Sequence, residues 1–243
     1  MNKKPYLQKI VYERDTVNQT EYPFSIPFLK KFNAIDLHKD VTFLVGENGA
    51  GKSTLIEAIA LRLELSPEGG NKNFRLETSA NTSPLYQHLN FVKSYYKPKD
   101  YFFLRAESFY NLATYMDKVN YLKGYGGTSL HQQSHGESFL SVLNNKLQGN
   151  GLYIFDEPES ALSPQGLLQA IALIHKLVQL DAQFIIATHS PILMSYPNAK
   201  ILQIGNDGIT EVKFEETEHY KTYKLFFQGH EKLINSILHH VEK

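Results

Sequence analysis

Several features are missing from this sequence of 243 residues, and each absence narrows the functions open to it. It contains no cysteine, which excludes disulfide bonds, thiolate metal sites and cysteine nucleophiles together. No stretch approaches the roughly 20 apolar residues that span a bilayer. No apolar segment of the kind found in signal peptides follows the basic N-terminus. We therefore expect a cytoplasmic protein without membrane insertion.

Net charge is also missing, because 25 basic and 25 acidic side chains give a formal charge of zero. The globally basic surface that is typical of avid nucleic-acid binding is therefore absent. One short basic and aromatic island, residues 95–99, could stack on bases, although a solvated loop is the interpretation we favour. We expect any contact with nucleic acid to be weak or indirect.

Short apolar runs alternate with segments of helical spacing. The runs predict buried strands at residues 41–45, 101–104, 152–155 and 184–187. Helical spacing begins at Ser53 and recurs at residues 109–122, 167–180, 218–227 and 231–241. The alternation predicts an α/β fold, a mostly parallel sheet with flanking helices on both faces. There is no heptad run long enough for a coiled coil.

The two ends of the chain and one central stretch do not share this alternation of buried strands and helices. Residues 7–17 have a strand-like pattern, and residues 201–204 and 209–214 flank a Gly-Asn-Asp-Gly turn that is typical of a hairpin. Residues 71–98 are polar and predict no definite element. We expect one domain over residues 1–243, with a short helical or irregular insertion at about 66–134.

The segment GENGAGKS, residues 46–53, matches the phosphate-binding pattern GxxxxGK[ST] in full. A predicted strand precedes this segment and a predicted helix follows it, which is the context in which the pattern binds phosphate. We therefore favour a phosphate-binding loop over a glycine-rich turn that binds no ligand. Glycines let backbone N–H groups face phosphates, and the start of the helix adds unpaired donors. Lys52 can reach the β- and γ-phosphates, and the Ser53 hydroxyl can bind Mg²⁺. The nucleotide-binding residues predicted here are Gly46, Asn48, Gly49, Ala50, Gly51, Lys52, Ser53 and Thr54.

Two acids end the apolar run at residues 152–155. Asp156 stands at the predicted end of the strand, where it can hold Mg²⁺ as a Walker B aspartate does. Glu157, one residue further, can act as the general base that activates water. Two acids could also simply cap a strand at the protein surface. Because a phosphate-binding loop is present in the same chain, Mg²⁺ binding and general-base catalysis explain the pair better.

Three further segments carry a resemblance to a known family. DEPESALS, at residues 156–163, is similar to the Walker B and D-loop segment of ABC-class ATPases. ATHSP, at 187–191, resembles their switch-histidine segment, and QSHGE, at 133–137, stands where their signature motif belongs. The chain thus resembles the small stand-alone predicted ATPases of bacteria, which are AAA-family ATPases of the ABC class. The DEPE and ATHSP wording is similar to DNA-repair and overcoming-lysogenization-defect type ATPases.

The resemblance implies a P-loop NTPase of ABC-ATPase type that uses ATP and Mg²⁺. Lys52 would then contact phosphate, Glu157 would be the base, and His189 would bond the γ-phosphate and orient the water. Ser134 and Gly136 would touch the ATP held by a second subunit, so the resemblance implies a homodimer that forms on ATP binding. Such a dimer would drive or switch an unidentified protein partner in DNA repair or defence.

The sequence also departs from the family pattern. Its signature segment has Gln133 and His135 where the usual motif has leucine and glycine. No Q-loop glutamine follows the strand at residues 101–104, and Glu107 is one candidate to replace it as a metal or water ligand. The aromatic residue that would stack on adenine is left open between Tyr12, Tyr22 and Phe24. Zinc is not predicted at the histidines near the signature segment.

Two other functions compete with the soluble dimeric ATPase. A nucleotide-binding subunit of an ABC transporter would need a membrane partner and a coupling Q-loop glutamine, and both that missing glutamine and the DEPE wording count against it. A small-molecule P-loop kinase would need neither a signature segment nor the switch histidine, yet both are present.

Overall fold

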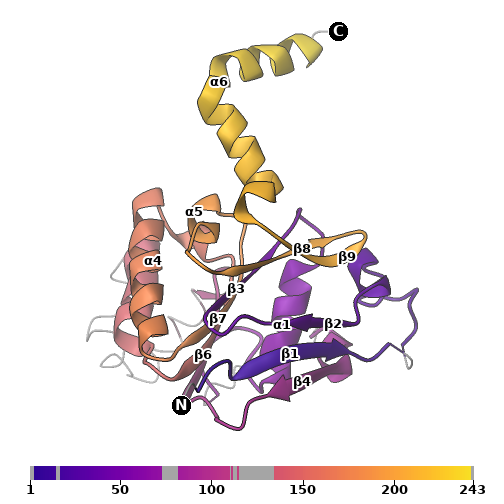
Figure 1. The fold of residues 1–243 in the computed structure, drawn as a ribbon, viewed down its shortest axis with the longest axis vertical. Helices are drawn as coiled ribbons and strands as arrows, with labels where there is room; N and C mark the ends of the chain where they lie inside the picture. Colours follow the sequence, from indigo (N-terminus) through magenta and orange to yellow (C-terminus); the bar gives the residue numbers. More distant parts are fainter. Residues whose placement is uncertain are drawn as a thin grey trace.

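Six strands form a central sheet in the computed structural model, which describes residues 3–14, 17–72, 82–109, 111, 114 and 134–241 (Figure 1). Their order is β5-β6-β7-β3-β8-β9, and all neighbours are parallel except the last pair. The mostly parallel α/β sheet predicted from the sequence is thereby confirmed. The strands are β3 (Val41–Val45), β5 (Asp100–Arg105), β6 (Gly151–Asp156), β7 (Gln183–Ala187), β8 (Lys200–Gly205) and β9 (Gly208–Val212).

Successive residues of β3 face opposite sides of this sheet, and both sides are covered. Phe43 belongs to a core that includes α3 (His135–Ser141) and α4 (Pro164–Gln179). Leu44 belongs to a second core that includes α1 (Lys52–Arg62). Strands buried on both faces consist of continuous apolar runs. That property is what made β3, β6 and β7 predictable.

A smaller antiparallel sheet, with the order β2-β1-β4, packs with α1 in the second core. Its strands are β1 (Leu7–Tyr12), β2 (Ala34–Asp36) and β4 (Leu89–Lys93). β4 lies in the stretch for which the sequence predicted no element, because Leu89 is its one buried residue. Short helices connect the larger elements: η1 (Pro27–Lys30), η2 (Pro84–His88), η5 (Val142–Lys146), η6 (Pro158–Ala161), α5 (Pro191–Met194) and η7 (Phe214–Glu216).

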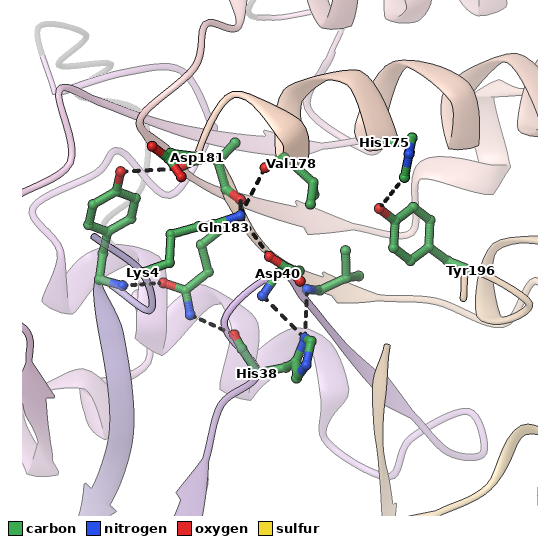
Figure 2. Close-up of polar contacts among 11 residues, drawn as sticks. Lys4, His38, Asp40, His175, Val178, Asp181, Gln183 and Tyr196 are labelled. Atoms are coloured by element: carbon green, nitrogen blue, oxygen red, sulfur yellow. Dashed lines mark hydrogen bonds and ion pairs between the residues drawn. The ribbon is translucent and has the colours of Figure 1, made fainter. Parts of the chain in front are cut away.

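The side chain of Gln183 joins the two sheets at the N-terminal edge of the central one (Figure 2). Its Oε1 accepts hydrogen bonds from the backbone N–H groups of Tyr6 and Leu7, at 2.9 and 3.0 Å. Its Nε2 donates to the carbonyls of Leu7 and His38, both at 2.9 Å. Every hydrogen-bonding group of this buried amide has a partner, as burial requires.

A buried ammonium group strengthens the same edge (Figure 2). Lys4 Nζ lies 2.6 Å from Asp40 Oδ1, and it also donates to the carbonyls of Val178 and Ala182 at 2.9 and 3.2 Å. Three acceptors satisfy the three donors of the ammonium group. The N-terminal segment is thereby tied to the end of α4, while the opposite edge of the sheet carries the loops of the site.

The C-terminal part forms the predicted hairpin and then a long helical arm. β8 and β9 pair antiparallel, and α6 (Glu218–Val241) stands out from the body and bends (Figure 1). The bend falls at Gly229, which has non-helical angles, so the two predicted helices are the two halves of α6. The helix predicted at 109–122 lies largely outside the described residues. None of the described helices combines the length and apolar character that a membrane crossing requires.

Candidate active site

The loop at residues 46–53 connects the end of β3 to the start of α1, as the sequence predicted. Gly46 and Gly51 have φ angles of 152° and 98°, which residues with a side chain rarely adopt. A Cβ on Gly46 would collide with the Ile204 carbonyl, and one on Gly51 would lie 2.7 Å from the Phe28 ring. Gly49, at the middle of the loop, has nothing within 4 Å of such a Cβ. The loop is therefore tightly held at its base and open at its centre.

Lys52 lies folded over this loop and is almost fully buried. Its Nζ donates to the carbonyls of Gly46 and Glu47, at 3.0 and 2.9 Å. Burial lowers the pKa of Lys52, and the nearby carboxylates of Glu157 and Asp156 oppose that shift. α1 begins at this lysine, and the preceding glycine offers no side chain to cap the first N–H groups. Those donors and the ammonium group form a cradle that suits a phosphate.

Ser53 and Asp156 meet beside the lysine, although 103 positions separate them in the sequence. The Ser53 hydroxyl donates to Asp156 Oδ1 at 3.2 Å. Burial raises the pKa of Asp156 to about 6, and Arg105 and the serine hydrogen bond partly offset that effect. A hydroxyl and one carboxylate are oxygen ligands that fit Mg²⁺, which completes its shell with water and substrate phosphates. No cluster of three or more His, Cys, Asp or Glu side chains that could hold a metal ion occurs within the described residues. A Mg²⁺ site of this kind does not require one, because water and phosphates supply the remaining ligands.

Arg105 lies beside Asp156 at the end of β5, the strand after which the sequence has no Q-loop glutamine. It ends β5 directly opposite Asp156 in the β5–β6 register. Its guanidinium lies 2.7 Å from Glu57 on α1, 3.4 Å from Glu107 and 3.7 Å from Asp156 Oδ2. Asp156 therefore has one oxygen toward Ser53 and the other toward Arg105. Glu107 is largely exposed and pairs with the arginine, so Arg105 is the side chain that reaches Asp156 from this strand.

Glu157 and His189 converge from the ends of two neighbouring strands, β6 and β7. Glu157 has a φ of 49°, an uncommon backbone conformation for a residue with a side chain. His189 Nε2 lies 3.6 Å from Glu157 Oε1, and this buried nitrogen has no hydrogen-bond partner among the described residues. Burial and the charge of Lys52 lower the pKa of His189, which favours the neutral ring. A buried, partnerless nitrogen beside a phosphate cradle is what a γ-phosphate sensor requires.

Glu159 is a site residue whose role the sequence reasoning missed. Its partly buried carboxylate accepts hydrogen bonds from the Thr188 hydroxyl, at 2.8 Å, and from the backbone N–H of His189. It therefore fixes the segment that carries the histidine to the segment that carries Glu157. Glu159 is the last acid of the DEPE segment, which was the only sign in the sequence of a role for it. The sequence did not indicate which group its carboxylate would bond.

Ser134 and Gly136 do not join the loop at 46–53 in the same chain. Ser134 begins α3 and shares reciprocal hydrogen bonds with Glu137, at 2.9 and 3.3 Å. A Cβ on Gly136 would lie 3.2 Å from the Ala161 carbonyl, so the start of α3 packs against η6. Within the described residues, no hydrogen bond links these two residues to the phosphate loop. Gln133 and His131 lie outside the described residues.

The three aromatic residues considered for adenine stacking have different environments. Tyr12 is buried and stacks on Phe32, with ring centroids 5.8 Å apart. Phe24 packs edge-on against His88. Tyr22 is 68% exposed, and its hydroxyl lies 3.3 Å from Thr54 Oγ1 in the first turn of α1. Tyr22 is thus the one of the three that is both open and adjacent to the phosphate loop.

Comparisons with known proteins identify the family of the chain. A family model described as an AAA domain matches residues 24–148, just over half of the chain. A second model, whose description joins an AAA domain to a Type IV TA system, matches residues 127–195. The phosphate import ATP-binding protein PstB of Oceanobacillus iheyensis is 25% identical over 193 residues, which are 67% of this chain and 67% of that protein.

Solved structures share the fold. CbiO1 from Clostridium perfringens, described as part of the ABC transporter complex cbiONQ, is 18% identical with a TM-score of 0.50, and the match covers 98% of this chain and 100% of that one. A bacterial Atm1-family ABC exporter with ATP bound is 13% identical with a TM-score of 0.52; the match covers 90% of this chain and 42% of the exporter chain. At such identities the likeness concerns the fold alone. The chain belongs to the AAA domain family and has the fold of the ABC-class ATPases.

Proposed function

We propose that this chain binds ATP with Mg²⁺ and hydrolyses it, and that ATP binding joins two copies into a dimer. The observation that carries the proposal is the meeting of Glu157 and the partnerless Nε2 of His189 beside the phosphate loop. A loop that only bound nucleotide would need neither group. The chain would work as one ABC-type domain over residues 1–243, with an insertion at about 66–134 that also contributes β4 and β5 to the two sheets.

Binding of the triphosphate uses the loop and the first turn of α1. Lys52 exchanges its two carbonyl partners for the β- and γ-phosphates, which compensates its buried charge more fully. Ser53 and Asp156 would hold Mg²⁺, which would supply positive charge for the phosphates. Arg105 keeps Asp156 oriented through the oxygen that does not face the serine. Tyr22 is the residue we propose to stack on adenine.

Hydrolysis depends on the two groups at the ends of β6 and β7. Glu157 is placed to accept a proton from the attacking water as general base. His189 donates a hydrogen bond from Nε2 to the γ-phosphate and orients that water. Glu159 supports both groups, because it anchors the backbone of His189.

The proposed dimer rests on the part of the phosphate loop that a single chain leaves uncovered. The centre of the phosphate loop is uncovered at Gly49, and within the described residues the hydrogen bonds of Ser134, at the start of α3, go to Glu137 and Ser138 and not to that loop. In a head-to-tail pair, the second copy would bring its Ser134 and Gly136 to the γ-phosphate bound by the first. Hydrolysis would replace that contact with charge repulsion and release the pair.

The proposal extends to the process that ATP turnover serves. The wording DEPE and ATHSP, together with the match to a family description that includes a Type IV TA system, supports a role in DNA repair or defence through a protein partner. Direct nucleic-acid binding would be weak, since the formal net charge is zero. The cytoplasm stays the predicted location.

A transporter subunit is the second candidate, because a phosphate import ATP-binding protein and CbiO1 are among the similar proteins. The feature that counts against it is Arg105, which stands in the place of the Q-loop glutamine. A membrane partner that copurifies with the full chain and stimulates its ATP turnover would favour this alternative.

Sedimentation of a Glu157→Gln protein tests the dimer. The substitution keeps the side chain's size but removes the base, so bound ATP persists and should hold the two copies together. We expect a monomer without nucleotide and a dimer with ATP and Mg²⁺. Adding Ser134→Arg should abolish this shift and leave ATP binding by each copy nearly intact.

Two controls complete the design. Lys52→Ala in the Glu157→Gln background should stay monomeric, since it binds little ATP. Mixing Lys52→Ala protein with Ser134→Arg protein should restore at most one working site in each pair. A Glu157→Gln protein that stays monomeric with saturating ATP contradicts the homodimer and indicates an unlike partner.

A further inference from the structure

His219 contacts His189 from α6, an element that contributes none of the groups proposed for catalysis. It is the second residue of α6, and its Nε2 lies 3.0 Å from His189 Nδ1. The two rings meet edge to face, with centroids 5.2 Å apart. Both line one cleft of about 410 Å³ together with the first residues of the phosphate loop, Gly46, Glu47 and Asn48. The base of the helical arm therefore forms a wall of the candidate active site.

The contact between the two rings decides which nitrogen of His189 carries its proton. A hydrogen bond between two neutral imidazoles needs one N–H and one lone pair. If His189 donated from Nδ1, its Nε2 would turn a lone pair toward the carboxylate of Glu157, 3.6 Å away. If His219 donates instead, His189 keeps its proton on Nε2, and the carboxylate faces an N–H. The second arrangement is electrostatically favoured, because a carboxylate only accepts hydrogen bonds.

The surroundings keep both rings neutral and hold His219 in place. Burial, assisted by the charge of Lys52, lowers the pKa of His189 and of His219. The residue before α6, Thr217, is fully buried and donates from its hydroxyl to the Phe214 carbonyl at 2.8 Å. The Phe214 ring of η7 packs against the Tyr220 ring in the first turn of α6, with centroids 4.8 Å apart. The base of α6 is thus anchored on the residues around η7.

We propose that His219 is a positioning residue for ATP hydrolysis: its Nε2–H holds His189 in the tautomer whose Nε2–H faces the γ-phosphate and Glu157. The hydrolytic arrangement therefore depends on how α6 is seated, and the arm is coupled to the site through one hydrogen bond. This inference rests on the proposed function, because the tautomer matters only if His189 bonds the γ-phosphate. Its closing experiment separates the two.

Three substitutions at this position change the hydrogen bond in different ways. His219→Gln keeps a donor at a similar reach, His219→Leu removes the donor, and His219→Glu offers an acceptor that draws the proton of His189 to Nδ1. We expect the leucine variant to lower kcat for phosphate release by about 10–100-fold, by analogy with the loss of a partner that orients a metal-ligating histidine. ATP affinity should stay within about twofold, and the glutamine variant should retain most of kcat. The glutamate variant should be at least as impaired as the leucine variant.

Two controls separate positioning from a general effect on the fold. His230→Leu changes an exposed histidine on the same helix and should leave kcat unchanged. In a His189→Ala background, His219→Leu should lower kcat no further, because its effect passes through His189. Equal losses in the glutamine and leucine variants, or a full further loss in that background, would overturn the proposal.

The tautomer itself can be measured without any turnover. Two-bond ¹H–¹⁵N NMR spectra of ¹⁵N-histidine-labelled full-length protein distinguish a protonated Nε2 from a protonated Nδ1. We expect His189 to be protonated at Nε2 in the wild type and in His219→Gln, and to shift toward Nδ1 in His219→Glu. A wild-type His189 protonated at Nδ1 would refute the inference. A protein with the expected tautomer that binds ATP but never releases phosphate would refute the proposed function instead.

Discussion

Replacing Gln183 by leucine should destabilise the protein strongly, although the two side chains are similar in volume. The amide makes four hydrogen bonds to backbone groups of Tyr6, Leu7 and His38, and three of the four are fully buried. A buried polar group left without a partner costs about 1–3 kcal/mol, so three groups give about 3–9 kcal/mol. We expect about 3–5 kcal/mol, because the edge of the sheet can relax and admit some water.

The measurement is chemical and thermal unfolding of the variant beside a matched control. For a chain of this length, such a loss corresponds to a fall in Tm of about 6–20 °C. Gln179→Leu makes the same chemical change at an exposed position near the end of α4, and it should shift the free energy of unfolding by less than about 0.5 kcal/mol. If Gln183→Leu were as mild as Gln179→Leu, the idea that this amide joins the two sheets would be wrong.

Three further predictions concern the site, pH and nucleic acid. Glu159→Leu should lower phosphate release at least about tenfold with little change in ATP affinity, since leucine can accept from neither the Thr188 hydroxyl nor the His189 N–H; an unchanged kcat would contradict the anchoring role. Burial lowers the pKa of His38, whose Nδ1 accepts from the N–H groups of Asp40 and Val41 at 3.2 and 3.4 Å. As pH falls, His38 is therefore protonated in the unfolded chain before it is protonated in the folded protein, so the free energy of unfolding should fall below about pH 6.5. The fall should be smaller in His38→Asn, and urea unfolding at several pH values would measure it. Duplex DNA should bind weakly in gel shifts and release as salt approaches physiological concentration, whereas tight binding at that salt would favour a DNA-repair role by direct contact.

The central strands and the phosphate loop could be predicted because their signals are local. β3, β6 and β7 are buried on both faces and are therefore continuous apolar runs. The loop between β3 and α1 has glycines where the backbone needs them, so the pattern and the conformation coincide. The two halves of α6 were predicted as separate helices, and the kink at Gly229 explains why.

The missed features depend on partners distant in sequence. β4 is an edge strand with Leu89 as its one buried residue, so it lacks the alternation that marks a strand. Arg105 contacts Glu57, 48 positions away, and reaches Asp156 only through the β5–β6 register. Glu159 and His219 each contact the His189 segment at a separation of 30 positions. Such pairings are set by the order of strands in the sheet, and no local pattern of residue types encodes them.

The most direct test of the central claim is phosphate release by the wild-type chain and by Glu157→Gln, with ATP and Mg²⁺, at matched nucleotide occupancy. The account predicts steady release by the wild type and a rate about 10²–10⁴-fold lower for the variant, because the base that accepts the proton of the attacking water is gone. ATP affinity should be the same in both, since Lys52 and the loop are untouched. Equal release rates for the two proteins, or an ATP-bound wild type that releases no phosphate, would contradict it.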